Sequence, residues 1–282
     1  MKIIIFGGSG RLGAALKSYF TKNNLKVFTV GKNKKNDFSC DLTKSQNLDF
    51  IKKINPNIIF NCVALTNVNL CNDDIDKAYD INVKTAINLV RYLKKNKLRS
   101  KLIHISTDQV YNNKFKLNNN NEENINLSNN YSITKYLGEL VILNYKNSIV
   151  VRTNFFGHSK MKNRPSYTDY IKNNLEKNKS LRIPENIIFN PINLDILVEK
   201  LFLLAKTKLK GTFNIGSKNS LSKYSFAKKV AKKFKLNTRL IKPYKSNFIR
   251  DKRPLGTYMS VKKFEENTNL KLPSINYCIS IL

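Results

Sequence analysis

The sequence predicts an α/β fold built on a doubly wound parallel sheet, with a smaller C-terminal region. Residues 2–6 form a short apolar run rich in isoleucine, which is typical of a strand buried on both faces. A glycine-rich turn follows at once and leads into an amphipathic stretch at residues 14–20. Apolar runs and helical patterns then alternate as far as residue 153, which favours right-handed parallel βαβ units. The 282 residues are enough for a large domain with a full hydrophobic core.

The glycine-rich turn has the sequence GGSGRLG at residues 7–13. Gly7, Gly10 and Gly13 would give a tight turn, a close backbone approach and close helix packing, so that a pyrophosphate could lie against the helix N-terminus. The spacing is GxxGxxG rather than GxGxxG, and a purely structural turn is the alternative. Its place between a buried strand and a helix favours a nucleotide site. We therefore expect a dinucleotide-binding Rossmann domain at residues 1–153 and a substrate-binding region at residues 154–282, interleaved with late sheet elements.

The loop after the second expected strand, residues 25–30, lacks the carboxylate that many NAD enzymes use for the adenosine ribose. Its sequence is GKNKK at residues 31–35, and Lys32 offers a cation suited to a 2′-phosphate. This pattern favours NADPH, although a solvated lysine-rich loop explains it almost as well. Asp41 and Leu42 then precede a helix expected at residues 44–54.

A third strand is expected at residues 57–62. It leads into small and apolar residues at 63–66, where the carboxyl end of a strand would meet a cofactor crevice. A long helix is expected at residues 74–94 and a fourth strand at residues 102–106. The polar, asparagine-rich segment 112–130 is interpreted as a surface loop that could cover a substrate.

Tyr131 and Lys135 are four residues apart on an expected helix that runs to about residue 145, so both side chains lie on one face. A phenol has an unperturbed pKa of roughly 10, and a nearby ammonium would stabilise its anion and ease proton exchange with a carbonyl oxygen. Thr107, directly after the fourth strand, could donate a hydrogen bond to the same oxygen. Because YxxxK is common on exposed helices, the rest of the chain decides its meaning.

The pattern becomes less regular after a fifth strand at residues 148–152. Helices are expected at residues 167–175, 195–204 and 222–234, with a short strand at residues 212–215. Arg250 and Arg253 lie in a late loop, where two cations could hold a diphosphate. Ordinary surface arginines are an equal alternative.

The composition is strongly basic, with a formal net charge of +32. The lysines are scattered along the chain among many asparagines and isoleucines, which favours biased nucleotide composition over a dedicated nucleic-acid surface. Four cysteines without a CxxC pair and two histidines suggest neither a zinc site nor a disulfide framework. No apolar run approaches the roughly 20 residues that span a bilayer, and the first residues lead into the glycine turn rather than a signal-peptide pattern. We expect a cytoplasmic protein without a nucleic-acid or membrane partner.

With these pieces in place, the chain resembles extended short-chain dehydrogenases/reductases, and most closely the dTDP-4-dehydrorhamnose reductase family. The resemblance covers nearly the whole chain and rests on ordered motifs. These are GGSGRLG at residues 7–13, Asp41-Leu42, NCVALT at residues 61–66, Ser106-Thr107-Asp108, Tyr131 and Lys135 with Gly138-Glu139, Arg152-Thr153 and Arg253-Pro254. The resemblance implies a Rossmann fold, a nicotinamide cofactor, and reduction of the 4-keto group of a nucleotide-activated deoxysugar for cell-surface polysaccharide.

The resemblance also implies roles for individual residues. Added to Gly7, Gly13 and Lys32, the expected cofactor contacts are Gly10, Arg11, Leu12, Asp41, Leu42, Ala64, Leu65, Thr66, Tyr131 and Lys135. The expected substrate contacts are Thr107, Asp108, Phe155 and Arg253. In the mechanism that it implies, Tyr131 protonates the keto oxygen and Thr107 orients the carbonyl. Lys135 holds the nicotinamide ribose and lowers the pKa of the tyrosine.

Two positions depart from the family pattern. Related 4,6-dehydratases carry a glutamate base directly after Ser-Thr-Asp, where this chain has Gln109, which cannot take a proton. Reductases of the rhamnose branch usually carry an aromatic residue there, and a glycine where this chain has Ser132. An NAD-dependent epimerase or dehydratase and a non-catalytic NADP-binding regulatory subunit are the alternatives. The sugar, the choice between NADPH and NADH, a role for Mg²⁺ and a homodimer are left open.

Overall fold

The structure is a computed structural model that describes residues 1–44, 48–111, 125–159, 165–247 and 253–282. Most of the loop expected at residues 112–130, and Arg250, therefore lie outside the described residues. The chain forms two compact units. The first contains residues 1–107, 129–152 and 198–213, and the second contains residues 108–128, 153–197 and 214–282. The division of cofactor and substrate binding between residues 1–153 and 154–282 stays a prediction.

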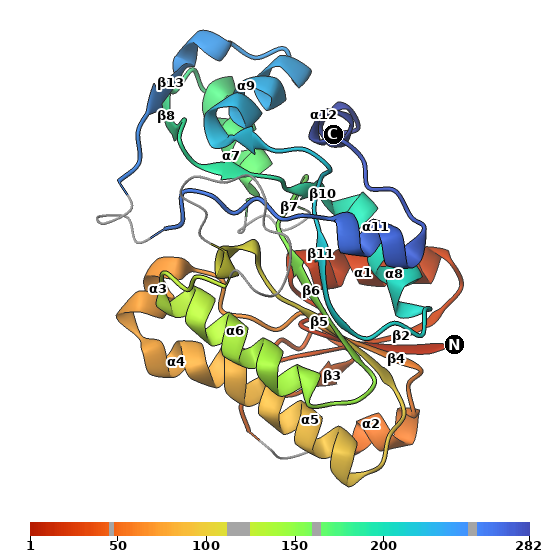
Figure 1. The fold of residues 1–282 in the computed structure, drawn as a ribbon. Helices are drawn as coiled ribbons and strands as arrows, with labels where there is room; N and C mark the ends of the chain where they lie inside the picture. The colour runs from red at the N-terminus through yellow and green to blue at the C-terminus, as the bar shows by residue number, and fades with distance from the viewer. Residues whose placement is uncertain (45–47, 112–124, 160–164, 248–252) are drawn as a thin grey trace. The chain divides into compact units, whose positions relative to one another are not determined.

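A seven-stranded sheet organises the first unit (Figure 1). Its strands are β1 (Lys2–Phe6), β2 (Lys26–Gly31), β3 (Phe38–Ser39), β4 (Ile58–Asn61), β5 (Lys101–Ile105), β6 (Ser148–Thr153) and β11 (Gly211–Ile215). They lie in the order β11-β6-β5-β4-β1-β2-β3, and the pairs from β3 to β6 are parallel. The chain thus moves outward from β1 to β3 and returns to β4 on the other side of β1. This topology confirms the predicted Rossmann-type sheet, whose ligand crevice is expected at that reversal.

Helices cover both faces of this sheet (Figure 1). They are α1 (Arg11–Lys22), α2 (Asp49–Ile54), α3 (Val68–Asp73), α4 (Ile75–Tyr79), α5 (Thr85–Lys95), α6 (Asn130–Leu143) and α8 (Leu194–Ala205). Alternate side chains of a strand point to opposite faces, so Ile4 and Phe6 of β1 join one core cluster with side chains of α2, α5 and α6. On the opposite face, the ring of Phe20 in α1 packs against Phe60 and Phe202, with centroid distances of 5.4 and 5.1 Å.

The helix expected at residues 74–94 is not uniform. After α4, a π-helical turn occupies Asp80–Lys84 before α5 begins. A π-turn adds one residue between hydrogen-bonded turns and is frequent at functional sites. Here it contains Asn82, whose side chain forms hydrogen bonds with Leu65 and Thr134 outside this helix. No helix within the described ranges is both long and apolar enough to cross a bilayer.

The second unit is built from short elements. Its strands form the two-stranded sheets β10-β7, β12-β9 and β13-β8, where β7 is Phe155–Phe156, β8 Leu181–Pro184, β9 Ile188–Phe189, β10 Ile192–Asn193, β12 Leu221–Ser222 and β13 Ile241–Tyr244. Its helices are α7 (Tyr167–Glu176), α9 (Lys223–Lys233), α11 (Lys262–Thr268) and α12 (Ile275–Ser280). The aromatic side chains of this unit pack around Phe226 of α9. The rings of Phe156 and Phe189 both meet its ring edge-on, with centroid distances of 4.9 and 5.4 Å.

Candidate active site and cofactor cradle

The glycine turn between β1 and α1 is tightly enclosed by backbone. Gly7 has φ of 77°, and a Cβ atom there would lie 3.0 Å from the backbone carbonyl of Cys62 at the end of β4. A Cβ on Gly13 would lie 2.3 Å from the carbonyl oxygen of Gly7. The first position needs a conformation that side chains rarely adopt, and the second needs the space that a side chain would fill. Both glycines are therefore required for α1 to begin directly above the sheet.

The N-terminus of α1 has the form of an anion cradle. Gly10 is the N-cap residue, with extended backbone angles, and no side chain caps the helix there. A twelve-residue helix carries a partial positive charge at its N-terminus, where the backbone N–H groups of the first turn point out of the helix. Since Gly10 has no side chain to cover these groups, a pyrophosphate can approach the backbone closely. The turn thus fits the dinucleotide that the sequence predicts.

The loop after β2 holds two of the predicted cofactor residues in an ion pair. The ammonium of Lys32 lies 2.9 Å from the carboxylate of Asp41. Although partial burial alone would raise the pKa of Asp41, hydrogen bonds from Lys32 and Thr43 lower it. Leu42 is buried in the core, and its carbonyl oxygen accepts a hydrogen bond from Asn88 of α5 at 2.8 Å. In this structure the charge of Lys32 is therefore already balanced by Asp41.

Asn82 fixes the segment after β4, where Ala64, Leu65 and Thr66 are predicted to meet the cofactor. The backbone N–H of Leu65 donates to Oδ1 of Asn82 at 2.8 Å, and Nδ2 of Asn82 donates back to the carbonyl of Leu65 at 3.3 Å. The same Nδ2 donates to the hydroxyl of Thr134 on α6 at 3.0 Å. One buried amide therefore ties the strand end to the helix that carries the predicted catalytic pair.

Tyr131 and Lys135 both lie on α6 and are buried, with exposures of 7% and 1%. The helix begins with a capping box between Asn129 and Ser132, which explains its start just before Tyr131. The ammonium of Lys135 donates to the carbonyl of Ile105 at 2.7 Å. This bond holds α6 against the end of β5, where the buried Thr107 follows two residues later in the same unit.

Burial is the main influence on Lys135. It lowers the pKa of the ammonium to about 8, while the neighbouring Glu139 and Cys62 oppose the shift. The Lys135 charge in turn lowers the pKa of His104, which burial already holds well below its ordinary value. At neutral pH the site therefore combines a protonated lysine with a neutral histidine. A buried cation on the same helix face as a phenol suits stabilisation of a developing phenolate.

A buried ion pair supports this arrangement and was not predicted. Two nitrogens of the Arg152 guanidinium donate to the Glu139 carboxylate, at distances of 2.7 to 3.1 Å. The hydroxyl of Ser106 donates to the same carboxylate. The three residues come from β6, α6 and the end of β5, so the network fixes the helix relative to two strands. The signal in the sequence was one charge in each of two largely apolar stretches, Glu139 in residues 136–143 and Arg152 in residues 148–153.

The second unit contains the other predicted substrate residues. Asp108 is buried, and its carboxylate accepts a hydrogen bond from Asn154 at 2.7 Å. Burial and the positive charge of Arg253 lower the pKa of Lys223, whereas Asp108 raises it. Asp108, Lys223 and Arg253 are therefore electrostatic neighbours, and Lys223 is a cation that sequence reasoning missed. Phe155, the remaining predicted substrate residue, lies in β7.

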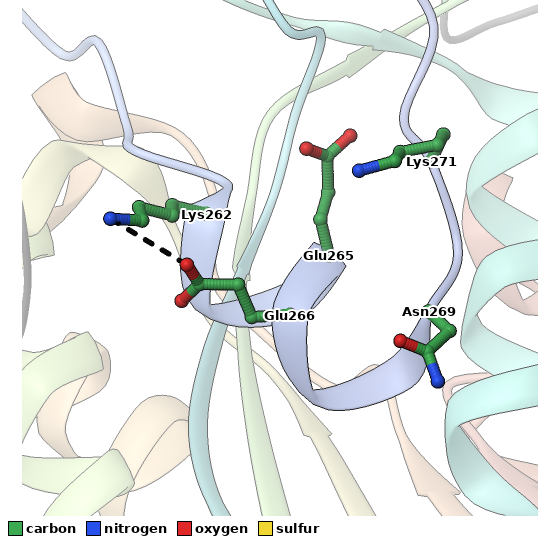
Figure 2. Close-up of a pocket in the computed structure, with 5 residues that line it drawn as sticks. All are labelled: Lys262, Glu265, Glu266, Asn269 and Lys271. Atoms are coloured by element: carbon green, nitrogen blue, oxygen red, sulfur yellow. Dashed lines mark ion pairs between the residues drawn. The ribbon is translucent and has the colours of Figure 1, made fainter.

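One cavity is lined by residues of the second unit. A cavity of about 510 Å³ on α11 is lined by Lys262, Glu265, Glu266, Asn269 and Lys271, with Lys262 and Glu266 forming an ion pair (Figure 2). None of the predicted site residues lines it.

Within the described ranges, no group of three or more histidine, cysteine, aspartate or glutamate side chains could hold a metal ion.

Comparison with known proteins gives both close folds and full-length relatives. The spore coat polysaccharide biosynthesis protein SpsK of Bacillus subtilis is 25% identical over 268 residues, covering 94% of this chain and 91% of that protein. A dTDP-4-dehydrorhamnose reductase of Aggregatibacter actinomycetemcomitans is 31% identical over 115 residues, covering 39% of this chain and 36% of that enzyme. The crystal structure of a Bacillus anthracis dTDP-4-dehydrorhamnose reductase in complex with NADP superimposes with a TM-score of 0.89 at 22% identity, covering 99% and 97% of the two chains.

A family model extends this likeness along the chain. The model of the RmlD substrate binding domain matches residues 1–280. That range includes the glycine turn, the tyrosine and lysine of α6, and the charged residues of the second unit. The chain therefore belongs to the RmlD substrate-binding domain family.

Proposed function

We propose that this protein is an NAD(P)H-dependent reductase of the 4-keto group of a nucleotide-activated deoxysugar, acting in the synthesis of cell-surface polysaccharide precursors. The observation that carries the proposal is one unit that combines an uncapped glycine cradle at α1 with the buried Tyr131 and Lys135 of α6. The relatives support the substrate class, since one is a dTDP-4-dehydrorhamnose reductase and another a polysaccharide biosynthesis protein. The NADP in the Bacillus anthracis structure supports the cofactor class.

The cofactor is held by the turn from Gly7 to Gly13, by residues 64–66 after β4, and by Lys135. When bound, the reduced nicotinamide supplies the hydride that reduces the keto carbon. The positions of the turn and of Leu65 are fixed by the backbone packing and by Asn82, so little reorganisation is needed on binding. This preorganisation is what the protein contributes to orientation.

Tyr131 gives its hydroxyl proton to the keto oxygen as negative charge develops there. Thr107 donates a hydrogen bond to the same oxygen and fixes its direction. Lys135 remains protonated at neutral pH and stabilises the phenolate that Tyr131 leaves behind. Because the lysine is buried, its charge acts through a medium of low dielectric constant and has more effect than it would in water.

Substrate binding is assigned to Asp108, Phe155 and Arg253, with Arg253 directed to the diphosphate. Lys223 strengthens that assignment, since two neighbouring cations suit a diphosphate better than one. The unfavourable proximity of Lys223 and Arg253, which lowers the pKa of Lys223, would be relieved by a bound anion.

The epimerase, dehydratase and regulatory alternatives differ in their use of the cofactor. A reductase consumes one NADPH or NADH for each sugar, whereas an epimerase or dehydratase returns the cofactor to its starting state in each cycle. A regulatory subunit would bind the cofactor without turnover. Nicotinamide absorbance during incubation with a panel of nucleotide-linked 4-keto-6-deoxysugars separates these outcomes. Net oxidation with one sugar supports the reductase, and binding without oxidation across the panel contradicts it.

A homodimer is the assembly that the surface of α6 favours. Ile133, Leu137, Leu140 and Leu143 are exposed along one face of this helix. The neighbouring α4 exposes Ile75 and Tyr79. The helical segment that starts at α4 is acidic at its beginning and basic at its end, so a copy related by a two-fold axis perpendicular to this segment would place opposite charges together. We therefore assign this face to a second copy of the chain.

A further inference from the structure

The side chain of Asn36 lies between the glycine turn and the carboxyl end of β2. It is only 9% exposed, although it belongs to a loop whose neighbouring side chains are mostly exposed. A Cβ atom on Gly8 would lie 2.9 Å from Oδ1 of Asn36, and one on Gly31 would lie 2.9 Å from its Nδ2. The amide is therefore in direct contact with the turn on one side and with the end of the strand on the other.

The position of this amide is fixed by local hydrogen bonds. Its Nδ2 donates to the carbonyl of Asn33 at 2.8 Å, and the backbone N–H of Asn36 donates to the same carbonyl at 3.1 Å. Within the described part of the chain, no hydrogen bond reaches its Oδ1. The loop thus holds the side chain in place and directs an uncharged acceptor toward Gly8.

The two carboxylates of the same loop are engaged elsewhere. Asp37 accepts hydrogen bonds from the backbone N–H and the hydroxyl of Thr29 in β2, at 2.8 and 2.7 Å. Asp41 accepts from Thr43 at 2.8 Å and pairs with Lys32 at 2.9 Å. Both carboxylates are therefore held by other groups, whereas a carboxylate that binds the adenosine ribose and repels a 2′-phosphate is expected at the end of β2. The neutral side chain of Asn36 is the group that lies there.

We propose that Asn36 determines the cofactor specificity of the proposed reductase, because its neutral amide lies where the 2′ position of the adenosine ribose meets the glycine turn. A carboxylate at this place would repel the 2′-phosphate of NADPH, whereas the neutral amide carries no opposing charge, and the Nδ2 hydrogen that is not bonded to Asn33 can donate to the phosphate. Lys32 pairs with Asp41 in this structure while its side chain is largely exposed, so its contact with the 2′-phosphate stays a prediction. The inference rests on the proposed function and assigns to Asn36 the discrimination between NADPH and NADH.

The test is direct measurement of the dissociation constants of NADPH and NADH by quenching or enhancement of fluorescence, without any sugar substrate. Asn36→Asp is expected to weaken NADPH by about tenfold or more relative to NADH, because a fixed negative charge then faces the 2′-phosphate. Asn36→Lys is expected to shift the ratio in the opposite direction. This pair of variants keeps the test decisive if one of them fails to fold.

Asn33→Asp is the matched control. It adds the same charge to the same loop, but Asn33 is exposed and its Oδ1 accepts from the backbone of Lys35 at 2.9 Å, a bond that aspartate also makes. A change in the NADPH to NADH ratio in Asn33→Asp as large as that in Asn36→Asp would overturn the assignment, as would an unchanged ratio in both Asn36 variants. Failure of the unaltered protein to bind either cofactor would contradict the proposed function itself.

Discussion

The ammonium of Lys135 lies 2.7 Å from the backbone carbonyl oxygen of Ile105, so the helix that carries Tyr131 is bonded to the end of the strand that precedes Thr107. The lysine is almost completely buried, and the neighbouring Glu139 and Cys62 oppose the lowering of its pKa by that burial. A positive charge held in this way is costly to bury and is retained where the charge has a task. In the proposed reaction that task is to stabilise the phenolate of Tyr131.

The first prediction concerns stability against pH. The pKa of Lys135 falls from 10.5 to about 8 on folding, so the unfolded chain binds more protons than the folded one between these values. The free energy of unfolding should therefore rise by an amount on the order of 3 kcal/mol as the pH increases from about 8 to 10.5. Urea unfolding of the unaltered protein and of Lys135→Met at both pH values isolates this contribution. An equal change with pH in the two proteins would contradict the assigned pKa.

The second prediction concerns the proton donor. Tyr131→Phe should lower kcat by roughly 10² to 10⁴, because it removes the hydroxyl and leaves the ring in its apolar contacts with Val68, Cys71 and Ala78. The dissociation constant of the cofactor should change little. Tyr136→Phe on the same helix is the control and should retain full turnover. Activity in Tyr131→Phe equal to that of the control would exclude Tyr131 as the acid.

The third prediction concerns the buried ion pair. Glu139→Gln leaves the guanidinium of Arg152 buried without its countercharge, which should lower the free energy of unfolding by about 3–5 kcal/mol. Asp80→Asn removes an exposed pair with Lys84 in the same unit and should cost less than about 1 kcal/mol. Chemical denaturation measures both. Similar losses in the two variants would show that the buried pair contributes no more to stability than an exposed one.

The fourth prediction concerns the two hydrogen bonds between the Asn82 side chain and the backbone of Leu65. Asn82→Ala leaves the N–H and the carbonyl of Leu65 without their side-chain partner, so the dissociation constant of the cofactor should rise about tenfold. Asn96→Ala, which removes only one bond to the carbonyl of Tyr92 at the end of α5, is the control. Isothermal titration of the cofactor distinguishes them. An unchanged cofactor affinity in Asn82→Ala would mean that cofactor binding does not depend on the hydrogen bonds between Asn82 and Leu65.

The fifth prediction concerns assembly. Leu137→Glu and Leu140→Glu together should convert a dimer to a monomer, because they place two carboxylates in the apolar face of α6. Tyr277→Glu alters an exposed aromatic residue of α12 and should leave the mass unchanged. Light scattering after size-exclusion chromatography reports the mass directly. If the unaltered protein is a monomer, this face of α6 is not a dimer interface.

Much of the first unit was predictable because its signals are local. Each buried strand appears as an apolar run, and the spacing of Tyr131 and Lys135 alone places them on one helix face. The two-residue strands of the second unit have no periodicity to detect, and they were missed. The interruption of the helix at Asp80–Lys84 was also missed, because it depends on Asn82 bonding to Leu65 and to Thr134, which are distant in sequence.

The sequence does not show which side chains of the site pair with one another in the folded protein. Lys32 was interpreted as a cation for a 2′-phosphate, and only the fold shows that it pairs with Asp41 nine residues later. No sequence signal marks Asn36, because an asparagine in a polar loop is common and its contact with Gly8 depends on the fold. Charge and residue type are properties of the sequence, whereas the pairing of those charges is a property of the fold.

Transfer of isotope from the cofactor to the sugar distinguishes reduction of the sugar from binding of the cofactor alone. NADPH or NADH carrying deuterium at the transferable position of the nicotinamide is incubated with the protein and each nucleotide-linked 4-keto-6-deoxysugar, and the product is examined by mass spectrometry and NMR. We expect stoichiometric oxidation of the cofactor, with deuterium at carbon 4 of one sugar. Cofactor that binds and keeps its deuterium, with every sugar unreduced, would contradict it.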